Sequence, residues 1–154
     1  TTNQPSIKSE ERKPAFSELS QILHISSFPD WDYISKWYYD LASTKAKTDF
    51  EIKATVNDIL QGNENLPTID KVKHIYNYIV KNIRYSSIPF LQGAIIPQKA
   101  SRVLSTKIGD CKDVSTLFVA MCKEIGVDAT WVLVCTKNRG KNECFLLIEH
   151  FFFG

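Results

Sequence analysis

The chain has 154 residues, which is enough for one domain with a hydrophobic core. Hydrophobic residues make up 44% and charged residues 23%, the balance typical of a globular protein, and the formal net charge is only +2. Because Lys and Arg are scattered over the predicted helices, no nucleic-acid partner is expected. No apolar run reaches the roughly 18 residues of a membrane-spanning helix. The start is polar and lacks an initiator Met, so we expect a piece of a longer protein.

The cysteines indicate neither a metal site nor a disulfide framework. There are four of them, Cys111, Cys122, Cys135 and Cys144. They form no C-x-x-C pair, so a structural zinc site is not expected. They are also too few for a disulfide scaffold. Cys135 and Cys144 flank a predicted turn and could form a disulfide across a hairpin. The alternative, which we adopt as the prediction, is that all four cysteines are free thiols.

The N-terminal part is predicted to be an arm followed by a helix. Residues 1–28 form an arm or linker, in which residues 21–28 alternate weakly like a strand that Pro29 ends. Asp30 then has the position of an N-cap, and apolar residues recur after it at helical spacing. We expect its aromatic residues to join the core rather than to form a ligand-binding set; these are Trp31, Trp37, Tyr38 and Tyr39.

Two more helices are predicted before residue 84. One begins at Thr48, which has capping-box spacing to Glu51, and ends near Gly62. Its inward-facing residues are expected to be Phe50, Val56, Ile59 and Leu60. The next follows Pro67 and is expected to have Thr68 as its N-cap. It carries one continuous apolar face, formed by Ile69, Val72, Ile75, Tyr76, Ile79, Val80 and Ile83.

The C-terminal half is predicted to contain two helices and two strands. After an extended or looped segment at residues 84–98, residues 99–105 favour a short helix and residues 111–125 a longer one. Residues 128–136 and 142–150 are then predicted to be strands paired through a turn at residues 138–140. Helices followed by strands indicate an α+β domain, with N-terminal helices packed against an antiparallel sheet.

The two cysteines of the longer helix differ in position. Cys122 lies among core residues, roughly 16 Å along the axis from Cys111, and is expected to be a buried, inert thiol. Cys111 lies in the first turn, where backbone N–H groups lack intrahelical partners and the helix dipole favours a thiolate. The same N–H groups could hold an oxyanion. From position alone, a nucleophile and a half-buried thiol beside a cap are equally good interpretations.

The neighbours of Cys111 are expected to shape this helix mouth. Gly109 allows a sharp turn and a close approach of substrate to the backbone. Asp110 and Asp113 are placed as cap and first-turn carboxylates, although their negative charge opposes formation of a thiolate. We expect an imidazolium nearby to compensate for this charge.

The segment "ASRVLSTKIGDCKDVSTLFVAMCKEIGVDATWVLV", residues 100–134, resembles the cysteine segment of the bacterial transglutaminase-like superfamily. In that family a Val-Leu pair precedes Gly-Asp-Cys-x-Asp, and a small and apolar helix, a Gly-containing turn and a strand follow. The matching positions are Val103–Leu104, Gly109–Asp113, Gly126 and residues 129–134. The resemblance extends over about residues 28–135. It implies a core domain at residues 29–154 that is truncated at its C-terminus.

The resemblance implies a papain-like fold and a Cys-His-Asp triad, with no cofactor and no metal. Cys111 corresponds to the nucleophile. His150 is the candidate base, and the alternative is that the true His lies beyond Gly154, as the triad Asp would. His24 and His74 are weaker candidates; His74 is expected to be solvated.

Three residues upstream of the cysteine helix are candidates for the cleft. Gln92 and Gln98 could add a side-chain donor to the oxyanion hole, as in related cysteine enzymes, although a loop amide in water is the commoner role. Tyr85 could border the cleft.

The expected function is a thiol enzyme, a cysteine protease, amidase or acyl transferase, that acts on an amide carbonyl of a peptide or protein through a Cys thioester. The alternative is a catalytically inactive binding or scaffold module. A location in the bacterial cell envelope or periplasm follows from the resemblance alone. Dimerisation through the last strand is also predicted, because missing strands would leave an open sheet edge.

Overall fold

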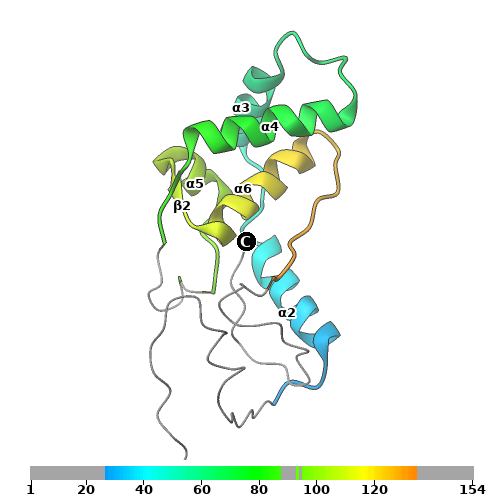
Figure 1. Ribbon diagram of the computed structural model, residues 1–154, viewed down its shortest axis with the longest axis vertical. Helices are drawn as coiled ribbons and strands as arrows, with labels where there is room; N and C mark the ends of the chain where they lie inside the picture. The colour runs from blue at the N-terminus through cyan, green and yellow to red at the C-terminus, as the bar shows by residue number, and fades with distance from the viewer. Residues whose placement is uncertain (1–26, 88–92, 94, 135–154) are drawn as a thin grey trace, which may run out of the picture.

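The computed structural model describes residues 27–87, 93 and 95–134. In chain order they form α2 (Trp31–Ser43), α3 (Phe50–Leu60), α4 (Thr68–Asn82), β1 (Arg84–Tyr85), α5 (Ala100–Thr106), β2 (Ile108–Gly109) and α6 (Cys111–Glu124). Helix α6 packs against α3, α4 and α5 (Figure 1). The segment after α6 runs back toward α2 (Figure 1). All five predicted helices in this part of the chain are therefore present.

Helix α2 begins as predicted, but its aromatic residues do not all join the core. The Asp30 carboxylate caps the helix by accepting a 2.7 Å hydrogen bond from the Tyr33 N–H. Tyr38 is buried, with 3% of its surface exposed. The expectation of a core position is wrong for the other three, Trp31, Trp37 and Tyr39, which are 40–51% exposed. None of the other described helices makes extensive contact with α2, and the buried residues of α2 are Ile34, Tyr38 and Ala42.

Helix α3 begins one residue later than predicted. Its N-cap is Asp49 rather than Thr48, and the Asp49 carboxylate accepts from the Ile52 N–H at 3.0 Å. The prediction that Phe50 points inward is therefore wrong, because Phe50 is 85% exposed. Ile52 is completely buried instead. Val56 and Leu60 are buried as expected. Asp and Thr are both favoured N-cap residues, so the spacing between Thr48 and Glu51 could not distinguish Thr48 from Asp49 as the cap.

Helix α4 has the predicted length but a narrower buried strip than predicted. Its N-cap is Pro67 rather than the predicted Thr68, and Pro67 provides no side-chain hydrogen bond to the helix. Ile75 and Ile79 are buried against α3 and α6. The other half of the predicted apolar face is exposed; Ile69, Tyr76 and Val80 are each 57–61% accessible. The helical period identified apolar positions correctly, but packing by α3 and α6 covers only one side of that stripe.

The sheet in the described part of the chain is the parallel pair β1 and β2, so it does not support the expected antiparallel sheet, whose strand at residues 142–150 lies outside the described residues. β1 and β2 pair with Arg84 opposite Ile108 and Tyr85 opposite Gly109. The chain between them contains α5, and a connection of this length permits parallel pairing that a tight hairpin does not. Backbone bonds from Arg84 N to Lys107 O and from Ser86 N to Gly109 O extend the ladder. This pairing delivers the chain directly into the start of α6.

The strand predicted at residues 128–136 is not formed over residues 128–133, and only Val134 takes part in a bridge. Side-chain contacts fix this segment instead. The Trp131 indole N–H donates to Thr116 Oγ1 at 3.1 Å, and its ring meets Tyr39 edge-on. The segment thus connects α6 to α2 across the outside of the core.

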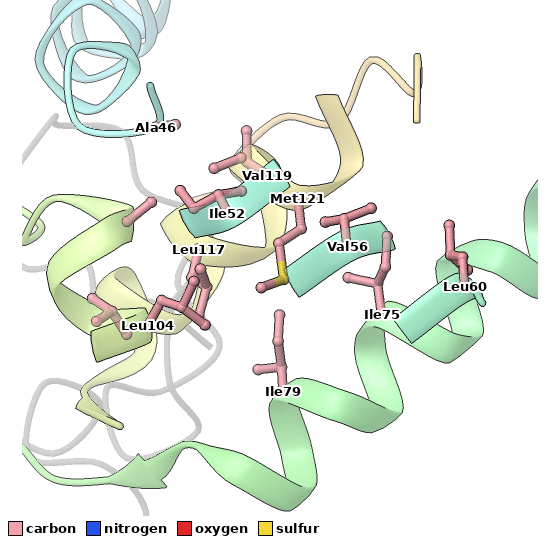
Figure 2. Packing of buried hydrophobic residues seen from close by; sticks show 13 residues of the cluster. Ala46, Ile52, Val56, Leu60, Ile75, Ile79, Leu104, Leu117, Val119 and Met121 are labelled. Atoms are coloured by element: carbon pink, nitrogen blue, oxygen red, sulfur yellow. The ribbon is translucent and has the colours of Figure 1, made fainter. Parts of the chain in front are cut away.

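The core lies where α6 meets three other helices (Figure 2). Met121 points between α3 and α4, near Val56 and Ile75 (Figure 2). Each large apolar side chain that is fully buried contributes about 1.5–3 kcal/mol to folding. Residues with at most 4% exposure come from all four helices: Ile52, Val56, Ile75, Ile79, Val103, Leu104, Leu117, Val119 and Met121. Burial on several sides fixes α6 as a rigid support for its first residue.

Several predictions lie outside the described residues. These are the strand at residues 142–150, the turn at 138–140, the bridge between Cys135 and Cys144, and all of the strand at 21–28 except residues 27 and 28, which are not in a strand. The division of the chain into an arm at residues 1–28 and a core domain at residues 29–154 also stays a prediction. So does dimerisation through the last strand. Among the described residues, no helix combines the length and apolar character needed to cross a bilayer.

Candidate active site

Cys111 is the first residue of α6, as the sequence predicted. Asp110 is the N-cap, and its carboxylate accepts from the Asp113 N–H at 3.3 Å. Asp113 returns the interaction, because its carboxylate accepts from the Asp110 N–H at 3.2 Å. The two aspartates therefore form a reciprocal capping box around the cysteine. The thiol is partly exposed at the mouth of a helix whose start is firmly fixed.

Gly109 is required for close packing rather than for a special backbone conformation. Its φ is not among the positive values of the described glycines, which belong to Gly62 and Gly126. A β-carbon added to Gly109 would lie 2.8 Å from the Asp113 β-carbon and 3.2 Å from Val103 Cγ1. This corrects the expectation of a glycine-dependent turn. The missing side chain lets α5 and the capping box approach each other.

Gln98 supports the capping box from the segment before α5. Its backbone N–H donates to Asp113 Oδ1 at 2.7 Å, and its side-chain amide donates to Asp113 Oδ2 at 2.9 Å. The Gln98 side-chain oxygen accepts from Arg102 Nε at 3.2 Å. Both ends of the amide are therefore engaged, and Asp113, which is 1% exposed, is well satisfied. This arrangement ties the approach segment to the first turn of α6.

Lys112 follows the cysteine and is buried. Only 3% of it is exposed, and its ammonium forms an ion pair with the Asp110 carboxylate. A buried ammonium is costly unless an anion compensates for it. The helix mouth thus combines two buried carboxylates with one buried ammonium. Sequence analysis gave Lys112 no role, because a lysine in a first turn is most often a solvated side chain.

Two tyrosines from other elements reach the same mouth. The pKa of Tyr85 is raised by partial burial first, then by the nearby charge of Cys111 and by a hydrogen bond to its side chain. Burial also raises the pKa of Tyr38 well above its usual value. Ionised groups of Cys111, Asp110 and Asp113 add to that shift in this order. Tyr85 was a predicted cleft residue, whereas Tyr38 was expected only in the core.

A cavity of about 510 Å³ opens beside Cys111. It lies between α4, β1, α6 and the segment after α6. No charged residue lines it in the described part of the chain; its walls are Tyr76, Ile79, Val80, Tyr85, Cys111, Val114, Ser115, Phe118, Val119, Thr130, Trp131, Val132 and Val134. Two of the exposed residues of α4, Tyr76 and Val80, are therefore part of the cavity wall. The thiol has space before it for a substrate group.

The remaining cysteine and histidine candidates are placed as follows. Cys122 is completely buried, as predicted, and burial raises its pKa to about 11. His74 is exposed, as predicted. His24, Gln92 and His150 lie outside the described residues. In the part of the chain that the structure describes, no three His, Cys, Asp or Glu side chains gather as a metal ion would require.

Sequence reasoning missed the roles of Lys112, Tyr38 and Trp131 around the helix mouth. Lys112 lies in a segment with a helical pattern, and Trp131 lies in a segment with a strand pattern. Such a pattern predicts the element but not the role of a single side chain within it. The signal that could have identified Lys112 in the sequence was charge balance. The carboxylates of two aspartates oppose the ionisation of a neighbouring thiol unless a cation compensates for them.

Comparison with protein families assigns the region around Cys111 to a family. The family model of the transglutaminase-like superfamily matches residues 53–152, which include the capping box and all of α6. Comparison with curated proteins and with solved structures gave no significant match. Since the matched region covers well over half of the chain, the protein belongs to the transglutaminase-like superfamily.

Proposed function

We propose that this protein is a thiol enzyme that acts on an amide carbonyl through a thioester on Cys111. The observation that supports this most directly is the position of the thiol. It lies at the first residue of α6, partly exposed, and faces a cavity of about 510 Å³. Membership of the transglutaminase-like superfamily is in accord with this chemistry.

The proposed reaction begins when the Cys111 thiolate attacks the carbonyl carbon of a peptide or protein amide. A tetrahedral oxyanion forms, and its collapse breaks the C–N bond and releases an amine, which takes up a proton. The acyl group remains on the sulfur as a thioester. Water then releases an acid and completes hydrolysis, or a second amine releases a new amide and completes transfer.

The start of α6 provides donors for the oxyanion. The capping box uses the N–H of Asp113, whereas the N–H groups of Cys111 and Lys112 have no acceptor within the helix. Two such donors held by a buried helix are the usual means of stabilising this charge. Tyr85, which lines the same cavity as Cys111, is proposed to border the reacting carbonyl.

Gln98 is proposed to act indirectly. Because its amide donates to Asp113 at 2.9 Å, it holds the capping box rather than an oxyanion. Gln92 stays a proposed oxyanion donor. His150 stays the proposed base, on the strength of its position downstream of Cys111, and a histidine and aspartate beyond Gly154 remain the alternative source of the triad.

The test is site-specific alkylation with iodoacetamide at pH 6, mapped by mass spectrometry. We expect Cys111 to react at least tenfold faster than Cys122, because the thiolate and not the thiol is nucleophilic. Fluorescent casein and dansyl-cadaverine then report hydrolysis and amine transfer. Cys111→Ala should abolish both activities, while Cys122→Ala serves as the control that keeps them.

The result would contradict the proposal if Cys111 were as unreactive as Cys122 in the folded protein. It would then favour the inactive binding module, since the same fold can serve without catalysis. A reactive Cys111 with no turnover of either probe would leave the nucleophile in place and reject these substrates.

A further inference from the structure

The mouth of α6 contains an excess of acidic groups close to the proposed nucleophile. Asp110 and Asp113 immediately flank the Cys111–Lys112 pair, and both are at most 5% exposed. Charges that are removed from water interact more strongly than charges at the surface. Two uncompensated carboxylates would therefore oppose the loss of a proton from the thiol and offset the helix dipole.

Hydrogen bonds stabilise one of these carboxylates. Asp113 accepts from the backbone and side chain of Gln98 and from the Asp110 N–H. These neutral donors stabilise the charge of the Asp113 carboxylate, but no cation pairs with it in the described part of the chain. The other carboxylate, Asp110, has the buried ammonium of Lys112 as its partner.

We propose that Lys112 is a positioning residue that keeps the helix mouth favourable to a Cys111 thiolate by neutralising Asp110. This inference rests on the proposed nucleophilic role of Cys111. The Lys112 side chain does not touch substrate in this proposal; it acts through Asp110 and through the field at the sulfur. It fills part of the role that sequence analysis assigned to a nearby imidazolium.

The ionisable groups around the thiol come from three elements. α6 and its cap contribute Asp110, Lys112 and Asp113, of which only Lys112 is cationic. Tyr38 of α2 and Tyr85 of β1 interact electrostatically with the thiol; tyrosine is neutral at physiological pH, and the raised pKa values of both keep it so well into the alkaline range. Lys112 is therefore the single buried cation among the described groups that face Cys111.

The test is the pH profile of Cys111 alkylation in three variants. Lys112→Met leaves Asp110 unneutralised and should slow alkylation about tenfold at pH 6. Asp110→Asn keeps an N-cap and leaves the cation, so alkylation should become faster at low pH. The double variant should return close to the wild-type profile.

These opposite signs separate the proposal from a purely structural role. If Lys112 only stabilised the fold, all three variants would shift reactivity in one direction, and that result would overturn the proposal. An unchanged profile in folded Lys112→Met would also overturn it. If Lys112→Met does not fold, the faster reaction of Asp110→Asn decides the question.

Two controls complete the experiment. Lys123→Met removes an exposed lysine from the last turn of the same helix and should leave the profile unchanged. Lys112→Arg keeps the charge and should remain near the wild-type midpoint. A wild-type Cys111 that does not react at all would refute the proposed function itself, whereas a reactive Cys111 that is insensitive to Lys112 would refute only this inference.

Discussion

Gly109 and Asp113 lie so close that a β-carbon on the glycine would sit 2.8 Å from the aspartate β-carbon. Gly109→Ala should therefore destabilise the protein by about 1–3 kcal/mol through overpacking. It should also disturb the capping box and change the alkylation rate of Cys111. Urea denaturation and thiol alkylation measure the two effects.

Gly126→Ala is the matched control for this substitution. Gly126 has a φ of +72° and open space around it, so the cost is backbone strain of roughly 1 kcal/mol. The reactivity of Cys111 should not change. Equal effects of the two variants on reactivity would show that packing at Gly109 does not position the thiol.

Gln98 should contribute to stability through Asp113. Gln98→Ala removes the 2.9 Å bond from its amide to a buried carboxylate and should cost about 1–3 kcal/mol. The backbone bond from residue 98 remains, which limits the loss. Gln61→Ala at the exposed end of α3 is the control and should be close to neutral. An equally small effect of both substitutions in chemical denaturation would contradict this role.

Thr116 should hold the segment after α6 against the helix. Thr116→Val keeps the shape of the side chain but removes the acceptor that the Trp131 indole N–H uses at 3.1 Å. We expect a loss of about 1–2 kcal/mol and faster hydrogen exchange of this indole proton, measured by NMR. Thr130→Val, at an exposed neighbouring position, should change neither quantity.

The stability of the protein should fall at alkaline pH. Burial raises the pKa of Cys122 from 9.0 to about 11, so above pH 9 the unfolded chain releases this proton before the folded chain does. Stability is therefore complete below about pH 9 and is lost as the pH rises through about 11, by roughly 2–3 kcal/mol. Cys122→Ala should flatten the decline in this window, as thermal unfolding at pH 8 to 11 would show.

Tyr38 provides a second alkaline contribution with the same sign. Its raised pKa means that the unfolded chain ionises first above about pH 10. Tyr38→Phe should therefore make the decline shallower only above that pH, whereas Cys122→Ala acts from about pH 9. Identical pH profiles for wild type and both variants would contradict these assignments.

Local sequence signals predicted the helices well because each helix carries its own pattern. Asp30 and Asp110 were identified as caps, and both act as caps. The error at Thr48 arose because two acceptable caps stand side by side. Burial was harder to predict, since Phe50 and Val80 are apolar at suitable spacing but no described element covers them.

The candidate site was predictable at its centre and not at its edges. The position of Cys111 follows from a local motif, and Gly109–Asp113 was correctly placed at a helix start. By contrast, the parallel pairing that brings Tyr85 to Gly109 joins segments far apart in the chain, and no local pattern encodes it. The buried ion pair of Lys112 also depends on the elements that exclude water around it.

The parallel pairing of β1 with β2 has a consequence for how variation in the chain can be tolerated. The cysteine helix is anchored by its own capping box, by Gln98 and by a ladder to β1, so the part of the connection between β1 and Gln98 need not determine where the sulfur lies. Doubling the length of a flexible connection costs only about 0.6 kcal/mol of closure entropy. Relatives could therefore acquire insertions there, and with them new surface around the cleft, without displacing the reactive atom.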